Sequence, residues 1–141
     1  MAWTMFYQDD WDLYDVLDYA AFVYLIQFPE CGEYYIGVKG VYQKVKDASK
    51  IKSTSIESNW EKYNSSSKEV QERIATGEHH TKQILWCFKT RQEAELVEAA
   101  LIAYCGTDHL CRNKALMTKT RLKKDNGEQK RIIRMLMEAF T

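Results

Sequence analysis

The chain has 141 residues, of which 45% are hydrophobic and 28% are charged, and its formal net charge is zero at pH 7. This composition is typical of one globular domain that is large enough to fold around its own core. The sequence excludes a membrane-spanning protein, because no apolar run approaches the roughly 18 residues that a spanning helix needs. The neutral net charge argues against a general nucleic-acid binder.

A β-hairpin is predicted near the N-terminus. Residues 22–28 and 34–38 are runs of aromatic and branched residues, and Pro29 and Gly32 supply turn chemistry in the connection between them. The stretch 40–58 that follows is polar, rich in lysine and only weakly periodic, which is typical of a loop.

A helix and a third strand are predicted in the middle of the chain. Ser66 followed by Glu69 is a capping-box pattern, so we expect a helix over residues 67–76 that ends at Gly77. Residues 81–88 are largely apolar and are predicted to form a mostly buried strand.

Two further helices complete the predicted fold. A second capping box opens a helix over residues 91–105, and Gly106 ends it. Residues 106–118 are predicted as a loop, and residues 128–140 as an amphipathic helix. The order strand, strand, helix, strand, helix, helix indicates an α+β domain in which helices pack on a short sheet.

Charge is distributed unevenly along the chain. The first twenty residues carry five aspartates and neither Lys nor Arg, whereas residues 39–52 hold five lysines against one aspartate. Residues 112–134 hold nine basic residues against two acidic ones. The basic segments are either solvated surfaces or a surface that faces nucleic-acid phosphates. The acidic segment, with its aromatic residues, is either an N-terminus packed on the core or a surface for a protein partner.

Glu98 stands out in the helix over residues 91–105. Ala94, Val97 and Leu101 mark its predicted buried stripe, and a carboxylate lies where a leucine is expected. An ionised carboxylate is costly to bury alone. Glu98 therefore either lies at the edge of the stripe, where it meets solvent or a lysine, or binds a divalent metal such as Mg²⁺ together with a substrate phosphate.

Two strand tyrosines also allow two interpretations. Tyr24 and Tyr35 are either core and sheet-surface aromatics, the usual role of tyrosine in a strand, or they converge beside Glu98. In the second case their phenols orient or deprotonate water and contact a phosphate. Gly37 would then let the backbone approach a ligand closely.

The sequence FVY at 22–24, YYIG at 34–37, the helical Glu98 and the later Asn113 together resemble the GIY-YIG nuclease family. The stretch ESNWEKYNSSSKEVQERI, followed by KQIL, is similar to small phage-encoded members of that family. The resemblance implies a small three-stranded antiparallel sheet flanked by helices. It also implies one active site that hydrolyses DNA phosphodiester bonds with a single Mg²⁺ or Mn²⁺ ion.

The resemblance further implies roles for single residues. Tyr24 would help to activate water and Tyr35 would be its partner, while Glu98 would be the metal ligand and Asn113 would support the site. The nuclease domain would cover residues 21–118. An acidic N-terminal extension would precede it at 1–20, and a basic amphipathic helix at 119–141 would pack on the same domain.

Two departures from the family pattern affect this assignment. Phe22 stands where the first glycine of the motif is expected, which a strand tolerates. The family also places an arginine after YIG to hold the scissile phosphate, but residues 38–72 contain none. Lys39, Lys44 or Lys46 would have to supply this charge, although a lysine lacks the planar fork that matches phosphate geometry. We include Lys44 and Lys46 among the predicted catalytic residues.

The predicted function is a metal-dependent DNA endonuclease of phage origin. The alternative is a degenerate nuclease fold that binds nucleic acid or a host protein, as an inhibitor or adaptor, without cleavage. Dimerisation is left open. Because the four cysteines lack paired spacing and no signal-peptide pattern is present, the expected location is the cytoplasm of the host cell. The residues predicted to contact DNA are Gly37, Lys39, Lys50, Lys52, Lys68, Arg112 and Lys114.

Overall fold

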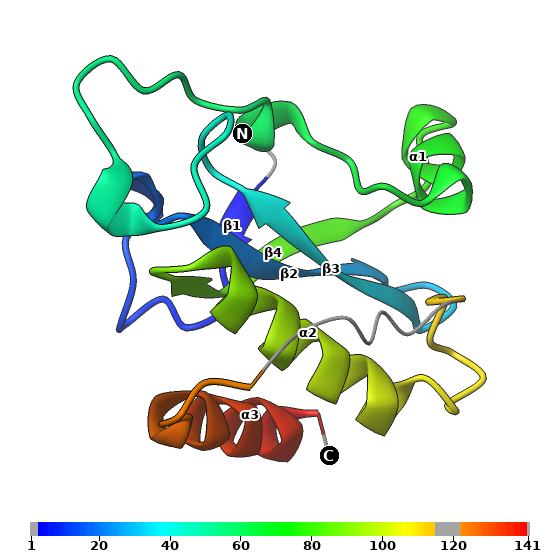
Figure 1. The fold of residues 1–141 in the computed structure, drawn as a ribbon. Helices are drawn as coiled ribbons and strands as arrows, with labels where there is room; N and C mark the ends of the chain where they lie inside the picture. The colour runs from blue at the N-terminus through cyan, green and yellow to red at the C-terminus, as the bar shows by residue number, and fades with distance from the viewer. Residues whose placement is uncertain (1–2, 115–121, 141) are drawn as a thin grey trace.

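A computed structural model describes residues 3–114 and 122–140 of the chain. Four strands form one sheet in the order β1-β4-β2-β3, which is the central layer in Figure 1. β2 pairs antiparallel with both β3 and β4, whereas β1 pairs parallel with β4. The strands are β1 (Trp3–Met5), β2 (Ala21–Phe28), β3 (Glu33–Gly40) and β4 (Thr81–Phe88).

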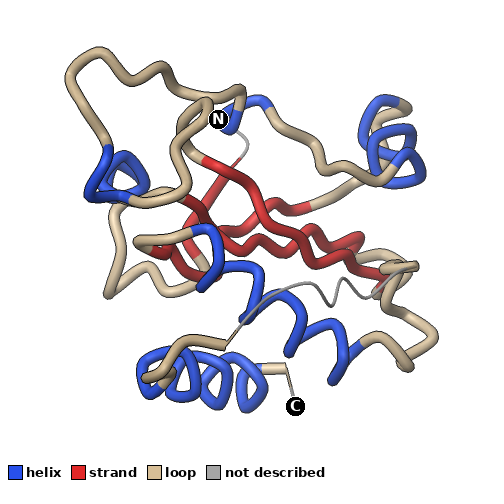
Figure 2. Tube along the Cα trace, in the orientation of Figure 1, coloured by secondary structure: helices blue, strands red, loops and turns tan. Residues whose placement is uncertain are grey.

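Helices and a long connection cover the two faces of this sheet. α2 (Arg91–Cys105) and α3 (Gly127–Ala139) lie on one face, whereas residues 41–67 and α1 (Lys68–Ala75) lie on the other (Figures 1 and 2). Short 3-10 helices occupy Leu13–Asp18, Ala48–Lys50 and Trp60–Lys62. α2 begins where the Thr90 hydroxyl accepts a hydrogen bond from the Glu93 N–H, as its capping sequence predicts.

β2 divides the core into two clusters because its side chains alternate between the two faces. Ala21, Val23 and Leu25 pack beneath α2 and α3. Phe22 and Tyr24 belong to the opposite cluster, which also contains residues of β1, α1 and the long connection. Because both faces of this strand are buried, its sequence is an almost unbroken apolar run rather than an alternating one.

The prediction of an α+β domain with helices on a sheet is confirmed, but the predicted three-stranded antiparallel sheet is wrong. The sheet has four strands and is mixed, because β1 adds a parallel strand at the edge of β4. Trp3 and Met5 of β1 are buried. A strand of three residues is too short to show a hydrophobic period, and it lies in a segment that we assigned to an acidic extension.

The other element boundaries agree closely with the predictions. β4 and α2 have the predicted ends, while α1 and α3 each differ by one residue at either end. The predicted loop at 106–118 and the boundary at residue 119 fall partly on residues 115–121, which lie outside the described residues. Within the described ranges, no helix is both long and apolar enough to cross a bilayer, and the four cysteines are free.

Candidate active site

Two phenols from neighbouring strands lie on the same face of the sheet. The ring centroids of Tyr24 in β2 and Tyr35 in β3 are 6.3 Å apart, and the rings are tilted by 31°. Tyr24 is paired with Gly37 across the two strands. A Cβ atom on Gly37 would lie only 2.3 Å from the Tyr24 ring and hydroxyl. The close approach that this glycine permits is therefore made by the Tyr24 ring.

A third phenol, Tyr63, belongs to the same group, which we call the phenol cluster (Tyr24, Tyr35 and Tyr63). The centroids of Tyr24 and Tyr63 are 6.1 Å apart, and the Tyr63 side chain has hydrogen bonds with Ser66 and Tyr24. The Tyr35 hydroxyl lies 3.3 Å from Ser66 Oγ. We did not predict Tyr63 as a site residue, because its sequence signal is one aromatic residue in a polar loop.

A buried lysine holds the loop that carries Tyr63 on the sheet. Lys82 of β4 donates hydrogen bonds to the Tyr63 carbonyl and, at 2.9 Å, to Asn64 Oδ1. Burial lowers the pKa of Lys82 to about 8. Ser65, which follows, has a φ of 84°, a value that non-glycine residues adopt only when their surroundings enforce it. The loop is thus held in one conformation.

Tyr24 is almost completely buried, and its phenol stays protonated at neutral pH. Burial raises the pKa of Tyr24 well above its ordinary value, a hydrogen bond with Ser65 opposes part of that change, and Tyr63, Tyr35 and Glu98 add to it. A neutral phenol can donate a hydrogen bond. Tyr24 can therefore orient a water molecule or a phosphate oxygen, but it is not a phenolate base in this environment.

Glu98 of α2 is partly buried and has an altered pKa. Burial raises the pKa of its carboxyl group to about 7, and Glu95 contributes in the same direction. Arg91 and a hydrogen bond with the Val38 backbone oppose this change. Among the residues that the structure describes, no Lys or Arg lies within 4.0 Å of this carboxylate. The described contacts therefore do not include the lysine pairing that we considered as an alternative.

Glu98 approaches the phenol cluster around the edge of β3. α2 packs on the face of the sheet opposite the phenols, and Val38 belongs to β3, the last strand on that side. Within the described ranges, no hydrogen bond joins Glu98 to a phenol, and its influence on Tyr24 is electrostatic. The result is a carboxylate and three phenols around one strand edge, which is less direct than the convergence of Glu98, Tyr24 and Tyr35 that we predicted.

Asn113 completes the edge of β3. Its Oδ1 accepts a hydrogen bond from the Ile36 N–H at 3.0 Å, and its Nδ2 donates one to the Ile36 carbonyl at 2.7 Å. Two residues earlier in β3, the Tyr34 N–H donates to the Leu110 carbonyl and the Tyr34 carbonyl accepts from the Arg112 N–H. Asn113 thus acts as a positioning residue, because it holds the strand segment that carries Tyr35.

Two cations lie close to this strand edge. Arg91, the first residue of α2, is two helical turns before Glu98 and so lies on the same side of the helix. Its Nη1 atom is 3.1 Å from where a Cβ on Gly40 would lie, and its ion pair with Glu95 is long, at 3.9 Å. The Nζ atom of Lys39 lies 4.2 Å from the centre of the Tyr63 ring.

Two other arginines are held by carboxylates. Arg73 forms ion pairs with Glu78 at 2.6 Å and with Glu33 at 2.8 Å. Arg112 makes paired hydrogen bonds to Glu69 at 3.0 and 2.8 Å. Arg112 was predicted to contact DNA, but its guanidinium group is already occupied by an acidic partner.

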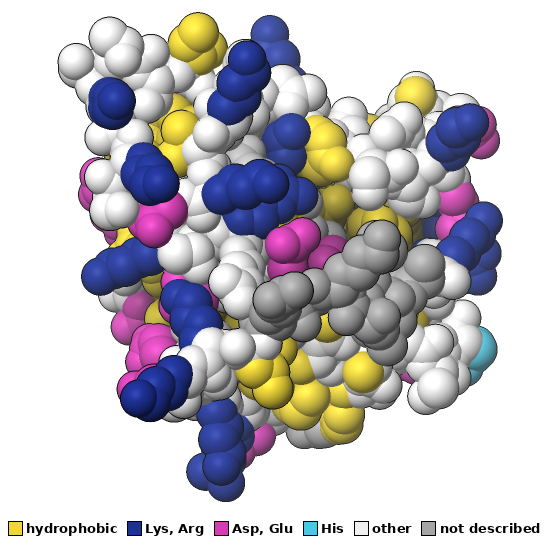
Figure 3. Space-filling view, in the orientation of Figure 1, with side chains coloured by type: hydrophobic (Ala, Val, Ile, Leu, Met, Phe, Trp, Pro, Cys, Tyr) yellow, Lys and Arg dark blue, Asp and Glu magenta, His cyan; other side chains and the backbone are white. Residues whose placement is uncertain are grey.

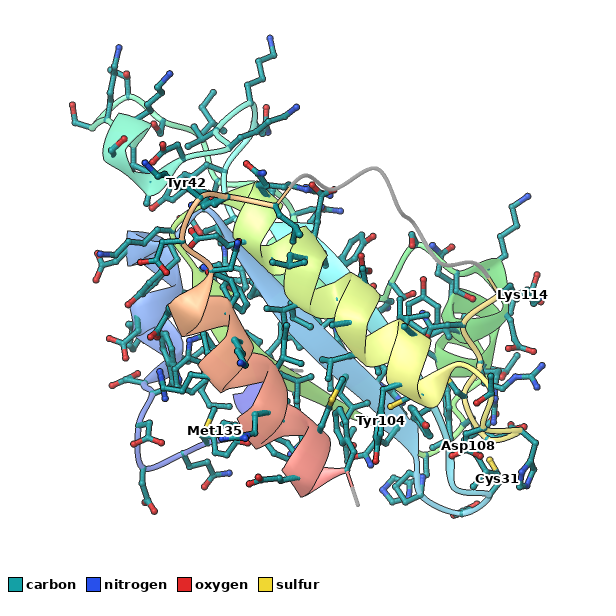
Figure 4. The ribbon with its side chains drawn as sticks, turned by 60° about the horizontal axis from the view of Figure 1, so that its bottom comes forward. Cys31, Tyr42, Tyr104, Asp108, Lys114 and Met135 are labelled. Carbon is teal, nitrogen blue, oxygen red and sulfur yellow. The ribbon has the colours of Figure 1, made fainter. Side chains whose placement is uncertain are left out.

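The remaining predicted basic residues lie away from the phenol cluster. Lys44 and Lys46 line a cleft beside the first turn of α2. Figure 4 shows Tyr42, which also lines this cleft, near the start of α2, and it shows Lys114 beside α1. The side chains that are simply exposed to solvent are Lys50, Lys52, Lys68 and Lys114.

The donor set for a metal is small. Within residues 3–114 and 122–140, no group of three or more His, Cys, Asp or Glu side chains is arranged to hold an ion. Glu98 would therefore be the single protein ligand among these residues. One carboxylate suits Mg²⁺, which keeps several waters and commonly binds through one or two carboxylates plus a substrate phosphate.

Comparison with known protein families gives one match. A family model described as "Putative endonuclease segE, GIY-YIG domain" matches residues 3–120. No curated protein and no solved structure matches the chain. The matched range contains the phenol cluster, Glu98 and Asn113, and it begins with β1, so the fourth strand is part of the matched domain. The chain belongs to the GIY-YIG nuclease family.

Proposed function

We propose that this protein is an endonuclease that hydrolyses phosphodiester bonds in DNA with the help of one Mg²⁺ or Mn²⁺ ion. Its family membership supports nuclease chemistry. The observation that carries the proposal is Glu98, a partly buried carboxylate with a raised pKa and no described cation within 4.0 Å. A strongly perturbed acid beside other polar groups is typical of a functional site.

The residues around Glu98 fit a metal-bound phosphate. A hard carboxylate oxygen is a suitable ligand for Mg²⁺, and water and a DNA phosphate would fill the remaining positions. When bound, the ion would stabilise negative charge on the phosphate and on the leaving oxygen. Because a carboxylate binds metal in its ionised form, the pKa of about 7 predicts an activity that increases as pH rises from 6 to 8.

The phenol cluster would orient the reacting groups. Tyr24 stays neutral, so its hydroxyl can donate a hydrogen bond to a water molecule or a phosphate oxygen. Tyr35, whose hydroxyl faces Ser66, would contribute a second phenol from the neighbouring strand. Lys39, whose Nζ atom lies over the Tyr63 ring, would supply positive charge for the phosphate, which stabilises charge that develops in the transition state.

The alternative is a fold that binds nucleic acid or a host protein without cleaving DNA. The zero net charge and the lack of arginine between residues 38 and 72 favour it. The lack of arginine in that range counts for less because Arg91 of α2 places a guanidinium group near the β3 edge.

Cleavage of supercoiled plasmid DNA in Mg²⁺ or Mn²⁺ tests the proposal. We expect Tyr24→Phe and Glu98→Ala to reduce the rate by at least about 100-fold, since each removes a group aimed at the reacting phosphate. Tyr14→Phe and Glu72→Ala are matched controls, because both side chains are exposed and outside the site. Cleavage that is unchanged by both site substitutions contradicts the assignment, whereas no cleavage by the natural chain in any metal favours the binding-only alternative.

A further inference from the structure

A cleft of about 570 Å³ lies between residues 40–47 and the first turn of α2. It lies next to the candidate active site, because Gly40 and Arg91 belong both to its lining and to the end of the β3 edge. Its lining also includes Lys44 and Lys46. Figure 3 shows several Lys and Arg side chains at the upper left of this view, where Figure 1 places the connection after β3, and further ones below them.

Both walls of the cleft are held in place by hydrogen bonds. The Arg91 N–H donates to the Lys46 carbonyl at 2.9 Å, which ties the connection to the start of α2. The Tyr42 hydroxyl donates to the Leu17 carbonyl at 2.7 Å. A preformed site loses little conformational freedom when a ligand binds.

The charges of the cleft favour an anion. Two carboxylates are present, but Asp47 Oδ1 already accepts two hydrogen bonds from Ser49, both at 2.9 Å. The other, Glu95, approaches Arg91 only to 3.9 Å. Three cationic side chains therefore line the cleft, whereas Asp47, one of its two carboxylates, is hydrogen-bonded within its own loop.

We propose that this cleft binds the phosphodiester backbone of duplex DNA beside the bond that is cut, through Lys44, Lys46 and Arg91. The position of these contacts relative to the cut rests on the proposed function. Arg91 and Glu98 are seven residues apart, or roughly 10 Å along the helix. One DNA strand carries a phosphate every 3.4 Å or so of helix axis. With the duplex axis parallel to α2, the cleft contacts phosphates about three nucleotides from the scissile one.

A continuous DNA backbone explains the cleft better than a free phosphate does. The volume of about 570 Å³ is far larger than one phosphate group, and the three cations come from two separate segments of the chain. A strand that passes from Glu98 along α2 would meet Arg91 and then the lysines. We therefore assign this surface to the DNA on one side of the cut.

Binding of a fluorescent duplex to the full chain in EDTA tests this inference without any cleavage. The variant Lys44→Gln/Lys46→Gln/Arg91→Gln should bind at least about ten times more weakly. The slope of log affinity against log salt should fall in magnitude by about 2 to 3, because each phosphate contact contributes close to one. The matched control Lys124→Gln/Lys130→Gln/Arg134→Gln removes the same charge from exposed positions in and before α3 and should change the slope by less than about one.

Further variants make the result specific. Lys44→Gln/Lys46→Gln alters only exposed side chains, so it should keep the natural melting temperature and still lower the slope by about 2. Inorganic phosphate at millimolar concentration should not displace the duplex, whereas displacement by it would show a site for free phosphate and overturn the assignment. Equal losses in the cleft and control variants, or no binding by the natural chain, would also overturn it. Binding with the expected slopes but without cleavage in metal would contradict the proposed function and leave the cleft intact.

Discussion

Replacing Glu98 by glutamine should change how the stability of the protein depends on pH. The two side chains have nearly the same shape, so the substitution removes the ionisable group and keeps the packing. Burial raises the pKa of Glu98 from its ordinary value of 4.5 to about 7. A pKa that is raised on folding contributes stability below the unfolded-state value, and that contribution is lost as pH rises through the folded-state value.

The size of the effect follows from the change in pKa. Moving from 4.5 to about 7 corresponds to roughly 3 kcal/mol, at about 1.4 kcal/mol per pH unit. Because the side chain is partly exposed to solvent, screening reduces this value. We expect the Glu98→Gln variant to gain about 1–2 kcal/mol in the free energy of unfolding, relative to the natural protein, between pH 5 and pH 8.

Urea unfolding in EDTA at both pH values measures this difference. A difference in stability between the two proteins that does not vary with pH would show that Glu98 titrates normally and that burial does not raise its pKa. A natural protein that is more stable than the variant at pH 8 would show instead that Glu98 is neutralised by a basic partner. Mg²⁺ at ten times its Kd should add about 1.4 kcal/mol to the natural protein and nothing to the variant.

Three further substitutions test the support of the site by thermal unfolding. Gly37→Ala should destabilise the protein by about 1–3 kcal/mol, because the new methyl group would overlap the Tyr24 ring, and an unchanged melting temperature would contradict that contact. Lys82→Met should cost about 1–3 kcal/mol by leaving the Tyr63 carbonyl without its donor. Burial lowers the pKa of Lys82 to about 8, so the natural protein should gain stability over this variant as pH rises from 8 to 10.5. A difference in stability that stays constant over this range would contradict the lowered pKa. Asn113→Asp should destabilise the protein at pH 7, because a carboxylate oxygen would replace the amide donor to the Ile36 carbonyl, and a stability equal to that of the natural chain would exclude this role.

Local patterns in the sequence were sufficient for the elements that carry the site. The apolar run at 22–28 and the capping box at Thr90 predict β2 and the start of α2, because each pattern is contained within a few neighbouring residues. Glu98 could be singled out for the same reason, since a carboxylate interrupts a regular apolar stripe.

The residues that sequence analysis missed depend on contacts between distant segments. Tyr63 becomes a site residue because Lys82, nineteen positions later, binds its carbonyl. Arg91 was overlooked because the family pattern directs attention to residues 38–72, whereas this guanidinium group reaches the β3 edge from α2. β1 was missed because three residues show no period. Such placements follow from the packing of the whole sheet, which no local pattern contains.

Single-turnover cleavage of a labelled DNA duplex by the natural protein and by Glu98→Gln, in Mg²⁺ and in EDTA, tests most directly whether Glu98 is the metal ligand of a nuclease site. We expect cleavage by the natural chain in Mg²⁺, none in EDTA, and a rate for the variant that is lower by at least about 100-fold. Equal rates for the two proteins in Mg²⁺, or undiminished cleavage in EDTA, would contradict a metal-dependent site at Glu98.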